Sequence, residues 1–432
     1  MDKSRHLVVV SFDAMVYEDL DLLRDKPAFS RFFREGSMVN RIRTVYPSLT
    51  YPAHTSMLTG ARCGRHGIVN NEPCEIGNLK SDWYWFHDPV KISDIHDAAK
   101  KAGLVTASIF WPVTGGHKSI DYLVAEYWAQ GPGDTLEKAY KRAGTSDEMF
   151  ENVVRPVEKT MASWNPLTSD DAKVEMACET IRRYRPNLLT LHLGQIDSFR
   201  HKYGISNDKV REGVLQSERY MQMIFDACRE AGIYEETDFV VCSDHGQINY
   251  TRKMNLNVLF VQHGFIKTSS DGSIQSWTAY AKSANYSAQI YLSDPSDRSL
   301  YMRVYAMLRR CCREGDKGIG RVLTARQARQ EYGLYGDFSF VIESDETTLF
   351  FSKWNEPLFS SCEPEEGYEK ASHGHDPSVG PQPVFLAVGP HFRQGVILPC
   401  APIINEAPTY AAILGVRLPD AEGTPLNALL RP

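Results

Sequence analysis

Short apolar runs rich in β-branched residues recur along the chain, and each ends in polar or charged residues. Such runs are typical of buried strands, and the clearest lie at 6–12, 105–110, 188–193, 238–242 and 384–388. Apolar positions at helical spacing lie between them and predict helices at 91–102, 170–184 and 208–231. Strands that alternate with helices indicate a doubly wound α/β fold, with a mainly parallel sheet covered by helices on both faces.

Residues 252–370 follow a different pattern, with half-buried strands expected at 285–292 and 337–342 and an amphipathic helix at 300–313. We therefore expect a small α+β unit, residues 252–370, inserted into one catalytic core made of residues 1–251 and 371–432. An insertion that returns to the rim of a site would act as a lid or a substrate-selecting cap. The alternative is a surface subdomain with no part in binding.

The bulk composition is that of a soluble globular protein, with 42% apolar and 24% charged residues among 432. A formal net charge of −6 provides no general attraction to nucleic acid or to an anionic membrane. We expect neither as a stable partner, and the sequence leaves the oligomeric state open.

The N-terminal apolar run is interrupted at Ser11 and Asp13, which makes it too short for the core of a signal peptide. No other stretch reaches the length of a transmembrane helix. The nine cysteines form no C-x-x-C pair. An odd number of cysteines without an export signal is typical of a reducing compartment, so we expect a cytoplasmic protein.

Carboxylates and histidines follow several of the predicted strands, and ligands of doubly wound sheets bind just beyond the carboxyl ends of the strands. Each residue alone has an ordinary structural explanation, such as helix capping by Asp13 or turn formation at Thr50. Four separate segments supplying such groups together favour a site. The candidates are Asp13, Thr50, Asp197, His201, Asp244, His245 and His373.

The spacing of these residues suits metal binding. Asp197 and His201 are four residues apart, so one face of a helix would offer both to one ion. The adjacent Asp244 and His245 can reach one ion only at an irregular strand end, which Gly246 permits. Carboxylate and imidazole ligands without a thiolate suit Zn²⁺ or Mn²⁺. The remaining histidines rank below this set, namely His54, His66, His375 and His391.

Several motifs occur together and in a familiar order: VVSFD at 9–13, TYPAH at 50–54, LTG at 58–60, HGIVNN at 66–71, FWP at 110–112, DSFRH at 197–201, SDHG at 243–246 and HGHD at 373–376. With these motifs the chain, from residue 6 to about 395, resembles the nucleotide pyrophosphatase/phosphodiesterase family of the alkaline phosphatase superfamily. The resemblance implies an alkaline-phosphatase-like fold and a metal-dependent hydrolase of phosphodiester or nucleotide pyrophosphate bonds. Its substrate would be a small phosphate ester such as a nucleotide.

The resemblance also implies roles for individual residues. Asn71 would donate a hydrogen bond to a phosphate oxygen, and Tyr51 would form a pocket wall. Thr50 would be the nucleophile and pass through a phosphothreonine intermediate. Two divalent ions are implied, Zn²⁺ before Mn²⁺. One would be bound by Asp197, His201 and His373, and the other by Asp13, Thr50, Asp244 and His245.

The sequence departs from the family pattern at Ala53, where asparagine is common, and at His375, where an aromatic or small residue is common. Many family members are secreted or membrane-anchored. The same metal set would serve a phosphomonoesterase, a phosphonate hydrolase or a phosphosugar mutase, and these stay alternatives. A sulfatase is disfavoured because no C-x-P-S-R segment is present, and a non-catalytic binding protein is disfavoured because the ligand set is complete.

Charge bears on the choice of substrate. Two dications would be balanced by Asp13, Asp197, Asp244 and a Thr50 alkoxide, so the assembled site would be near neutral. Such a site suits a diester monoanion, whereas a monoester dianion would call for a further cation. Arg200 is the one basic residue within a motif, and a lysine or arginine from 252–370 would reverse the preference.

Overall fold

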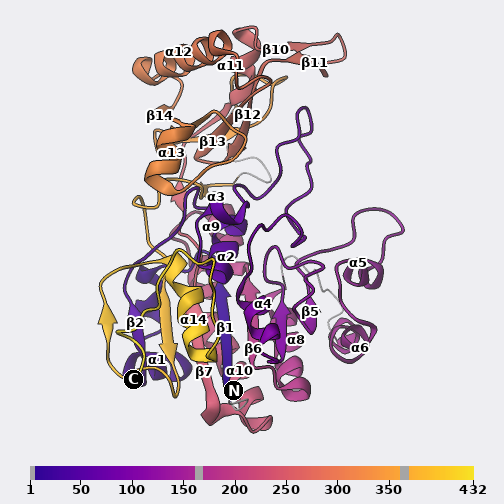
Figure 1. Ribbon diagram of the computed structural model, residues 1–432, viewed down its shortest axis with the longest axis vertical. Helices are drawn as coiled ribbons and strands as arrows, with labels where there is room; N and C mark the ends of the chain where they lie inside the picture. The colour runs from indigo at the N-terminus through magenta and orange to yellow at the C-terminus, as the bar shows by residue number, and fades with distance from the viewer. Residues whose placement is uncertain (1–4, 161–168, 361–368) are drawn as a thin grey trace.

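The computed structural model describes residues 5–160, 169–360 and 369–432. The parts of the predicted core at 1–4 and 161–168, and of the predicted insertion at 361–368, lie outside the described residues. An eight-stranded sheet dominates the lower half of Figure 1, in the order β20-β2-β19-β7-β1-β6-β4-β5.

The three central strands of this sheet are β1 (His6–Phe12), β6 (Leu188–Leu193) and β7 (Thr237–Cys242). Each is buried along its whole length, which explains why their sequences are continuous apolar runs. Strand β1 pairs in parallel with both β6 and β7. The parallel arrangement continues through β4 (Thr106–Ile109) and β5 (Tyr122–Val124).

The other side of the sheet departs from the parallel pattern. Strand β19 (Phe385–Val388) runs antiparallel to β7 and to β2 (Ser37–Val39), and β2 pairs in parallel with β20 (Ile397–Leu398). The predicted fold class, a mainly parallel sheet in an α/β protein, is confirmed. The antiparallel β19 is the exception, since an apolar run carries no information about strand direction.

Helices cover both faces of the sheet. Alternate residues of β1 point into two separate cores: Val8 and Val10 into one, Leu7 and Val9 into the other. The first core includes residues of α1 (Pro27–Glu35), α8 (Asp170–Tyr184) and α10 (Asp208–Glu230). The second includes residues of α2 (Thr50–Thr59), α4 (Ile95–Lys101) and α14 (Glu406–Leu414). Smaller helices are α3 (Cys63–His66), α5 (Leu136–Arg142), α6 (Asp147–Met149), α7 (Arg155–Thr160) and α9 (Gln195–Tyr203).

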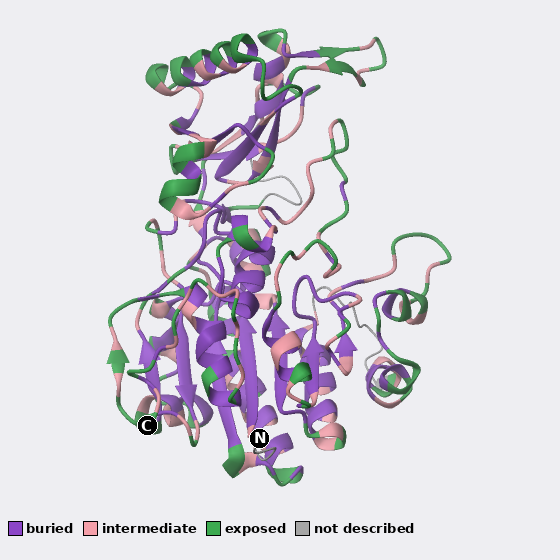
Figure 2. Ribbon diagram, viewed as in Figure 1, coloured by how far each residue is buried: buried purple, intermediate pink, exposed green. Residues whose placement is uncertain are grey.

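The 252–370 segment carries a second, antiparallel sheet in the order β12-β13-β15-β14, formed by β12 (Ala279–Ala284), β13 (Ser287–Leu292), β15 (Phe340–Ser344) and β14 (Ile319–Thr324). It packs with α11 (Leu256–Gln262) and α12 (Arg298–Glu314) around an apolar core of its own, visible as buried strands at the top of Figure 2. Helix α13 (Ala325–Tyr332) lies nearer the main sheet in Figure 1. The division into core and cap stays a prediction.

Short strands complete the chain. Strand β9 (Arg252–Asn255) pairs with β16 (Thr348–Phe351) and β17 (Phe359–Ser360), and β8 (Ile248–Asn249) pairs with β18 (Ala371–Ser372). The remaining pairs are β10 (Ile266–Thr268) with β11 (Ile274–Trp277), and β3 (Ile42–Arg43) with β21 (Ala401–Pro402). Through the described ranges, no helix combines the length and the apolar character needed to cross a bilayer.

Candidate active site

The central strands deliver the candidate residues to one edge of the sheet. Asp13 directly follows β1, and Asp244 with His245 lies just beyond β7. Strand β6 leads into α9, which carries Asp197 and His201 on one helical turn, as their spacing predicts. Because β7, β1 and β6 are adjacent and parallel, their carboxyl ends place all these side chains together.

The chain just after β7 passes close to the main chain at Pro381, and this close contact depends on Gly246. A Cβ atom there would lie 2.1 Å from the carbonyl oxygen of Pro381, so a larger residue would push the strand end away. The glycine therefore allows the chain to turn directly after Asp244 and His245, as the sequence predicts.

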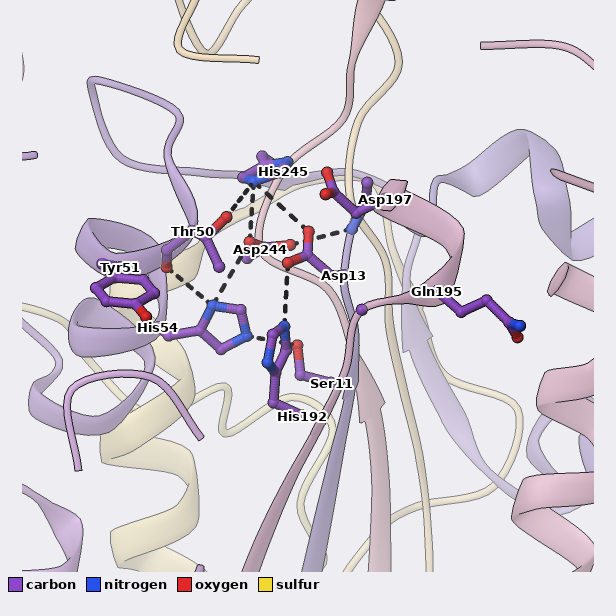
Figure 3. A network of polar contacts seen from close by, with 12 residues as sticks. Ser11, Asp13, Thr50, Tyr51, His54, His192, Gln195, Asp197, Asp244 and His245 are labelled. Atoms are coloured by element: carbon purple, nitrogen blue, oxygen red, sulfur yellow. Dashed lines mark hydrogen bonds and ion pairs between the residues drawn. The ribbon is translucent and has the colours of Figure 1, made fainter. Parts of the chain in front are cut away.

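Thr50 faces the groups after β1 and β7. It is the first residue of α2 and is buried, and its Oγ1 lies 3.1 Å from His245 Nε2. The same Nε2 lies 3.1 Å from Asp244 Oδ2 and 3.6 Å from Asp13 Oδ1. Figure 3 shows these four side chains converging on one point.

A second group lies next to the first. His201 Nε2 is 3.4 Å from Asp197 Oδ2, and His373 Nε2 is 4.0 Å from Asp197 Oδ1. The rings of His245 and His373 stack with centroids 3.9 Å apart, so the two groups share a border. Ligand atoms of Asp197, His201 and His373 lie within 4.8 Å of one another, and so do those of Asp13, Asp197 and His245.

Backbone carbonyls orient two of the imidazoles. His201 Nδ1 donates to the carbonyl of Ala371 at 2.8 Å, and His373 Nδ1 donates to that of Ser48 at 3.1 Å. With the proton on Nδ1, each ring turns the lone pair of Nε2 toward Asp197. This is how proteins fix the tautomer of a metal-binding histidine.

Three supporting residues lie outside the sequence-predicted set. Gln247 donates through Nε2 to the carboxylate and the carbonyl of Asp197. His192, within β6, donates through Nε2 to Asp13 Oδ2 at 3.0 Å. His54 Nδ1 donates to the carbonyl of Thr50 at 2.9 Å. Gln247, three residues after Asp244, and His54, the last residue of the TYPAH motif, had a signal in their positions, whereas His192 had none.

The buried carboxylates and neutral imidazoles of the site favour the binding of cations. Burial, and then the neighbouring carboxylates, raise the pKa of Asp13 well above its usual value, and burial likewise raises the pKa of Asp244. Burial lowers the pKa of His373 to about 4 and that of His245 further, so both rings stay neutral. Asp13 Oδ1 and Asp244 Oδ2 are buried and accept no hydrogen bond from the described residues. Unsatisfied carboxylate oxygens beside neutral imidazoles fit divalent metal ions.

Asn71 and Tyr51, predicted to contact substrate, lie beside Thr50. The backbone N–H of Tyr51 donates to Asn71 Oδ1 at 3.0 Å, which leaves Asn71 Nδ2 with no hydrogen bond to the described residues. Tyr51 is fully buried and packs edge-on against Trp83 at 5.3 Å between ring centroids. Trp83, which is 38% exposed and lines the neighbouring cavity, presents the aromatic surface there, and Tyr51 packs behind it.

Arg200 points away from the site. Its guanidinium pairs with Asp19 at 2.6 Å and is buried. The basic residue of the DSFRH motif therefore ties α9 to the segment after β1 and adds no positive charge near the candidate ligands. Two of the spare histidines have structural partners: His66 contacts Ser56, and His391 contacts Asp238.

The N-terminus of α9 is held by α8. Asp170 accepts hydrogen bonds from the backbone N–H groups of Gly194 at 3.1 Å and Gln195 at 2.9 Å. Its carboxylate also pairs with Lys173 at 3.1 Å, and both side chains are almost completely buried. Since Gly194 has no side chain to cap the helix, this cap from another helix fixes the turn that carries Asp197.

A third His/Asp group lies apart from the site, at His87, Asp97 and His117. His117 donates through Nε2 to Asp94 at 3.0 Å, and its Nδ1 accepts from the N–H of Ser119 at 3.1 Å. Asp97 accepts from the Ser119 hydroxyl and from the N–H of Asp94, which caps α4. Both nitrogens of His117 are occupied, so this group is a structural network.

A cavity of about 370 Å³ opens beside the second group and is the place where a ligand would reach it. Its lining includes His201, His373 and Asn71, together with Ser283, Asn285 and Lys353 of the 252–370 segment. In Figure 1 this segment stands directly above α2 and α9.

Known proteins with similar sequences are nucleotide-processing enzymes by name. Human ectonucleotide pyrophosphatase/phosphodiesterase family member 1 is 25% identical over 225 residues, 51% of this chain and 21% of that protein. Family member 7 from Rattus norvegicus is 23% identical over 257 residues, 57% of this chain and 51% of that protein. A bis(5′-adenosyl)-triphosphatase from Pongo abelii is 22% identical over 429 residues, 97% of this chain and 80% of that protein.

The chain thus spans about a fifth to about half of the length of the first two of these relatives. Among solved structures, murine ectonucleotide pyrophosphatase/phosphodiesterase 5, as an inactive variant in complex with AMP, has a similar fold. Its TM-score is 0.69 at 17% identity, over 99% of this chain and 100% of that chain. The sequence profile of the type I phosphodiesterase/nucleotide pyrophosphatase family matches residues 7–376. The chain belongs to the type I phosphodiesterase/nucleotide pyrophosphatase family.

Proposed function

We propose that the protein hydrolyses phosphodiester or nucleotide pyrophosphate bonds through a phosphothreonine intermediate on Thr50. The observation that carries the proposal is the position of the Thr50 hydroxyl, at the N-terminus of α2 and 3.1 Å from His245 Nε2, among two buried carboxylates. Its relatives carry phosphodiesterase and nucleotide pyrophosphatase names, and one solved relative binds AMP. A nucleotide-type substrate follows from that similarity.

Two divalent metal ions are part of the proposal, with Zn²⁺ as the first candidate and Mn²⁺ as the second, because the ligands are carboxylates and imidazoles. Bound there, the ions would lower the pKa of the Thr50 hydroxyl and neutralise charge on the phosphoryl oxygens. Asp197, His201 and His373 would hold one ion. The other would be held by Asp13, Thr50, Asp244 and His245.

The protein groups divide the reaction into two displacements at phosphorus. Thr50 Oγ1 bonds to phosphorus while the bond to the leaving oxygen breaks, and the leaving group takes that electron pair. Asn71 Nδ2 donates to a nonbridging oxygen and holds the phosphoryl group against Thr50. Water then attacks phosphorus, which frees Thr50 and releases the product. Two inversions give overall retention of configuration.

The charge of the site favours a monoanionic substrate. Three aspartates and the Thr50 alkoxide balance two dications, and Arg200 is committed to Asp19. We therefore propose that diesters and pyrophosphates react faster than monoesters. A phosphomonoesterase is the second candidate, because Lys353 in the cavity wall would supply a cation for a dianion.

The matched substrates bis(4-nitrophenyl) phosphate and 4-nitrophenyl phosphate, assayed with Zn²⁺ and with Mn²⁺, test the proposal. They release the same product, so their kcat/KM values can be corrected for intrinsic reactivity and compared directly. We expect the diester to be the better substrate after correction. Equal or faster monoester turnover would replace the proposal with the phosphomonoesterase.

A further inference from the structure

A second cavity, of about 380 Å³, lies where the 252–370 segment meets the loops above the main sheet. Helix α13, which lies nearer the main sheet than α11 and α12 (Figure 1), contributes Glu331 and Tyr332 to its wall. The paired strands β3 and β21 contribute Arg43 and Pro402. It shares no described lining residue with the cavity beside the candidate metal-binding residues. A separate cavity of this size suits a small organic molecule.

The inner wall of this second cavity is apolar apart from one hydroxyl. Val45 and Ile403 are buried in the wall, and the ring of Tyr46 stacks on that of Tyr332 with centroids 4.3 Å apart. Thr44, also in the wall, is only 8% exposed, and its Oγ1 is buried without a hydrogen bond to any described residue. Leaving a buried hydroxyl unpaired costs about 1–3 kcal/mol, so a polar ligand group beside Thr44 would gain a hydrogen bond that the protein does not use.

The acidic residues of the wall already have partners. Glu331 pairs with Arg321 at 2.5 Å. Asp376 accepts a hydrogen bond from the Tyr332 hydroxyl, and both the N–H and the hydroxyl of Ser378 donate to the same carboxylate. Neither carboxylate is therefore free to bind a cationic ligand in the cavity.

The two arginines of the wall are less firmly paired than these acids. Arg62 lies 3.7 Å from Glu422, and both side chains are partly exposed, so this ion pair contributes little. Arg43 is exposed and forms no ion pair with the described part of the chain. A guanidinium can bind a carboxylate through two parallel hydrogen bonds. The charge of the cavity therefore favours a small anion.

Two segments that line the cavity continue into the candidate active site. Residues 43–46 lead through Ser48 to Thr50, and residues 376–378 follow shortly after His373. The two segments meet at Ser48, whose carbonyl accepts a hydrogen bond from His373 Nδ1 at 3.1 Å. A ligand that moves one segment relative to the other would therefore move Thr50 relative to His373.

The loop that carries His373 is held on its other side by the turn between β12 and β13. The two approach so closely that a Cβ atom on Gly374 would lie 2.1 Å from the carbonyl oxygen of Ala284. Because the loop is confined between this turn and Ser48, a shift of the residues that follow it is passed to Ser48 and toward Thr50.

We propose that this second cavity is a ligand site that takes a small carboxylate with an apolar ring body and changes the turnover number of the enzyme. Arg43 binds the carboxylate, the Thr44 hydroxyl donates a hydrogen bond to it, and the apolar wall encloses the ring. The inference goes beyond the proposed function, since neither Arg43 nor Thr44 belongs to the candidate catalytic or metal-binding residues.

The test compares 2-naphthoate with its neutral isostere 2-naphthamide, by titration calorimetry on the metal-loaded protein. We expect the carboxylate to bind roughly tenfold more tightly, the size of one charge-assisted hydrogen bond, and Arg43→Ala to remove the difference. Thr44→Val should weaken carboxylate binding about fivefold without lowering the midpoint of urea unfolding, because valine keeps the shape and removes a hydroxyl that has no partner among the described residues.

Arg41→Ala is the matched control, because Arg41 is an exposed arginine two residues earlier that lines a neighbouring cavity and not this one. It should leave binding unchanged. Saturating 2-naphthoate should change kcat for bis(4-nitrophenyl) phosphate at least about twofold in the wild type and leave it unchanged in Arg43→Ala.

Equal affinity for 2-naphthoate and 2-naphthamide would overturn the inference. So would inhibition that is competitive with substrate and unaffected by Arg43→Ala, because the carboxylate would then bind at the candidate metal-binding residues. Binding that leaves kcat unchanged would contradict the coupling to Thr50 and His373. The binding comparison does not depend on which phosphate ester the enzyme cleaves, so its failure leaves the proposed function standing.

Discussion

Replacing Asp170 by alanine would test how α9 is held in the site. The carboxylate of Asp170 accepts two backbone hydrogen bonds from the start of α9 and pairs with Lys173 at 3.1 Å. Because both side chains are almost completely buried, Asp170→Ala removes the carboxylate partner of the Lys173 ammonium, which keeps only the Phe110 ring 5.1 Å away, and leaves two helix N–H groups without an acceptor.

The expected fall in the free energy of unfolding follows from these lost interactions. Breaking a buried ion pair from one side costs about 3–5 kcal/mol, and losing a helix cap costs about 1 kcal/mol. Since both effects act through one carboxylate, they overlap, and we expect the free energy of unfolding to fall by about 4 kcal/mol. Urea unfolding of the chelated protein would measure this fall without any contribution from bound metal.

The adjacent Asp171 provides the control. It lies on the same helix turn but is 45% exposed, and its partner Arg219 is 54% exposed. Asp171→Ala should cost less than about 1 kcal/mol, as exposed pairs do. The double variant Asp170→Ala/Lys173→Met removes the unpaired charge and should regain part of the lost stability. If Asp170→Ala costs no more than Asp171→Ala, the carboxylate does not hold α9.

The remaining predictions concern the nucleophile, the metal ions and pH. Thr50→Ala should leave fold and metal binding largely intact, since Asp13, Asp244 and His245 remain, yet lose at least about a hundredfold in turnover, measured by steady-state kinetics; smaller losses would exclude covalent catalysis through Thr50. Elemental analysis should find two ions per chain, and adding metal to chelated protein should release protons, because the pKa values of Asp13 and Asp244 are raised by burial. Asp197→Asn and Asp244→Asn should each empty a different ion position; loss of the same ion in both variants would contradict the assignment. Burial disfavours the charged forms of His117 and Asp94, but the charge attraction and hydrogen bond between them are larger. The pKa of His117 is therefore raised, and that of Asp94 is lowered. The pair therefore stabilises the fold above about pH 3.9 and below about pH 6.5, and this contribution is lost as pH rises through the raised pKa of His117. Asp94→Asn should accordingly cost more unfolding free energy at about pH 5.5 than at about pH 9, and an equal cost at both would refute the pairing.

Patterning in the sequence predicts the buried elements well. Strands β1 and β6 and helix α8 have the bounds that their apolar positions predict. A strand buried on both faces is a continuous apolar run, so its first and last residues are easily identified in the sequence. In the 252–370 segment the predicted strand at 285–292 begins at Ser287, because Asn285 adopts a left-handed conformation with φ 64° in the preceding turn.

The candidate site was predictable only where a motif marks it. The structure brings together the candidate metal-binding side chains and Thr50, and their roles stay predictions. His192 and Asp170 were not predicted, because a histidine inside a strand and an aspartate opening a helix have ordinary explanations in sequence. Their partners, Asp13 and the start of α9, become neighbours only through sheet order and helix packing. The location of the protein in the cell also stays a prediction.

The contact between Gly374 and Ala284 limits how the protein can be re-engineered. A chimera that exchanges the 252–370 segment for that of a relative would have to keep a main-chain carbonyl at the same place, within van der Waals reach of the Gly374 α-carbon. Gly374 has φ 91° as well, so a side chain there would be strained even if the donor turn were shorter. Segment exchange is therefore best planned with the 373–376 loop as part of the transplanted unit, so that the two surfaces are inherited together.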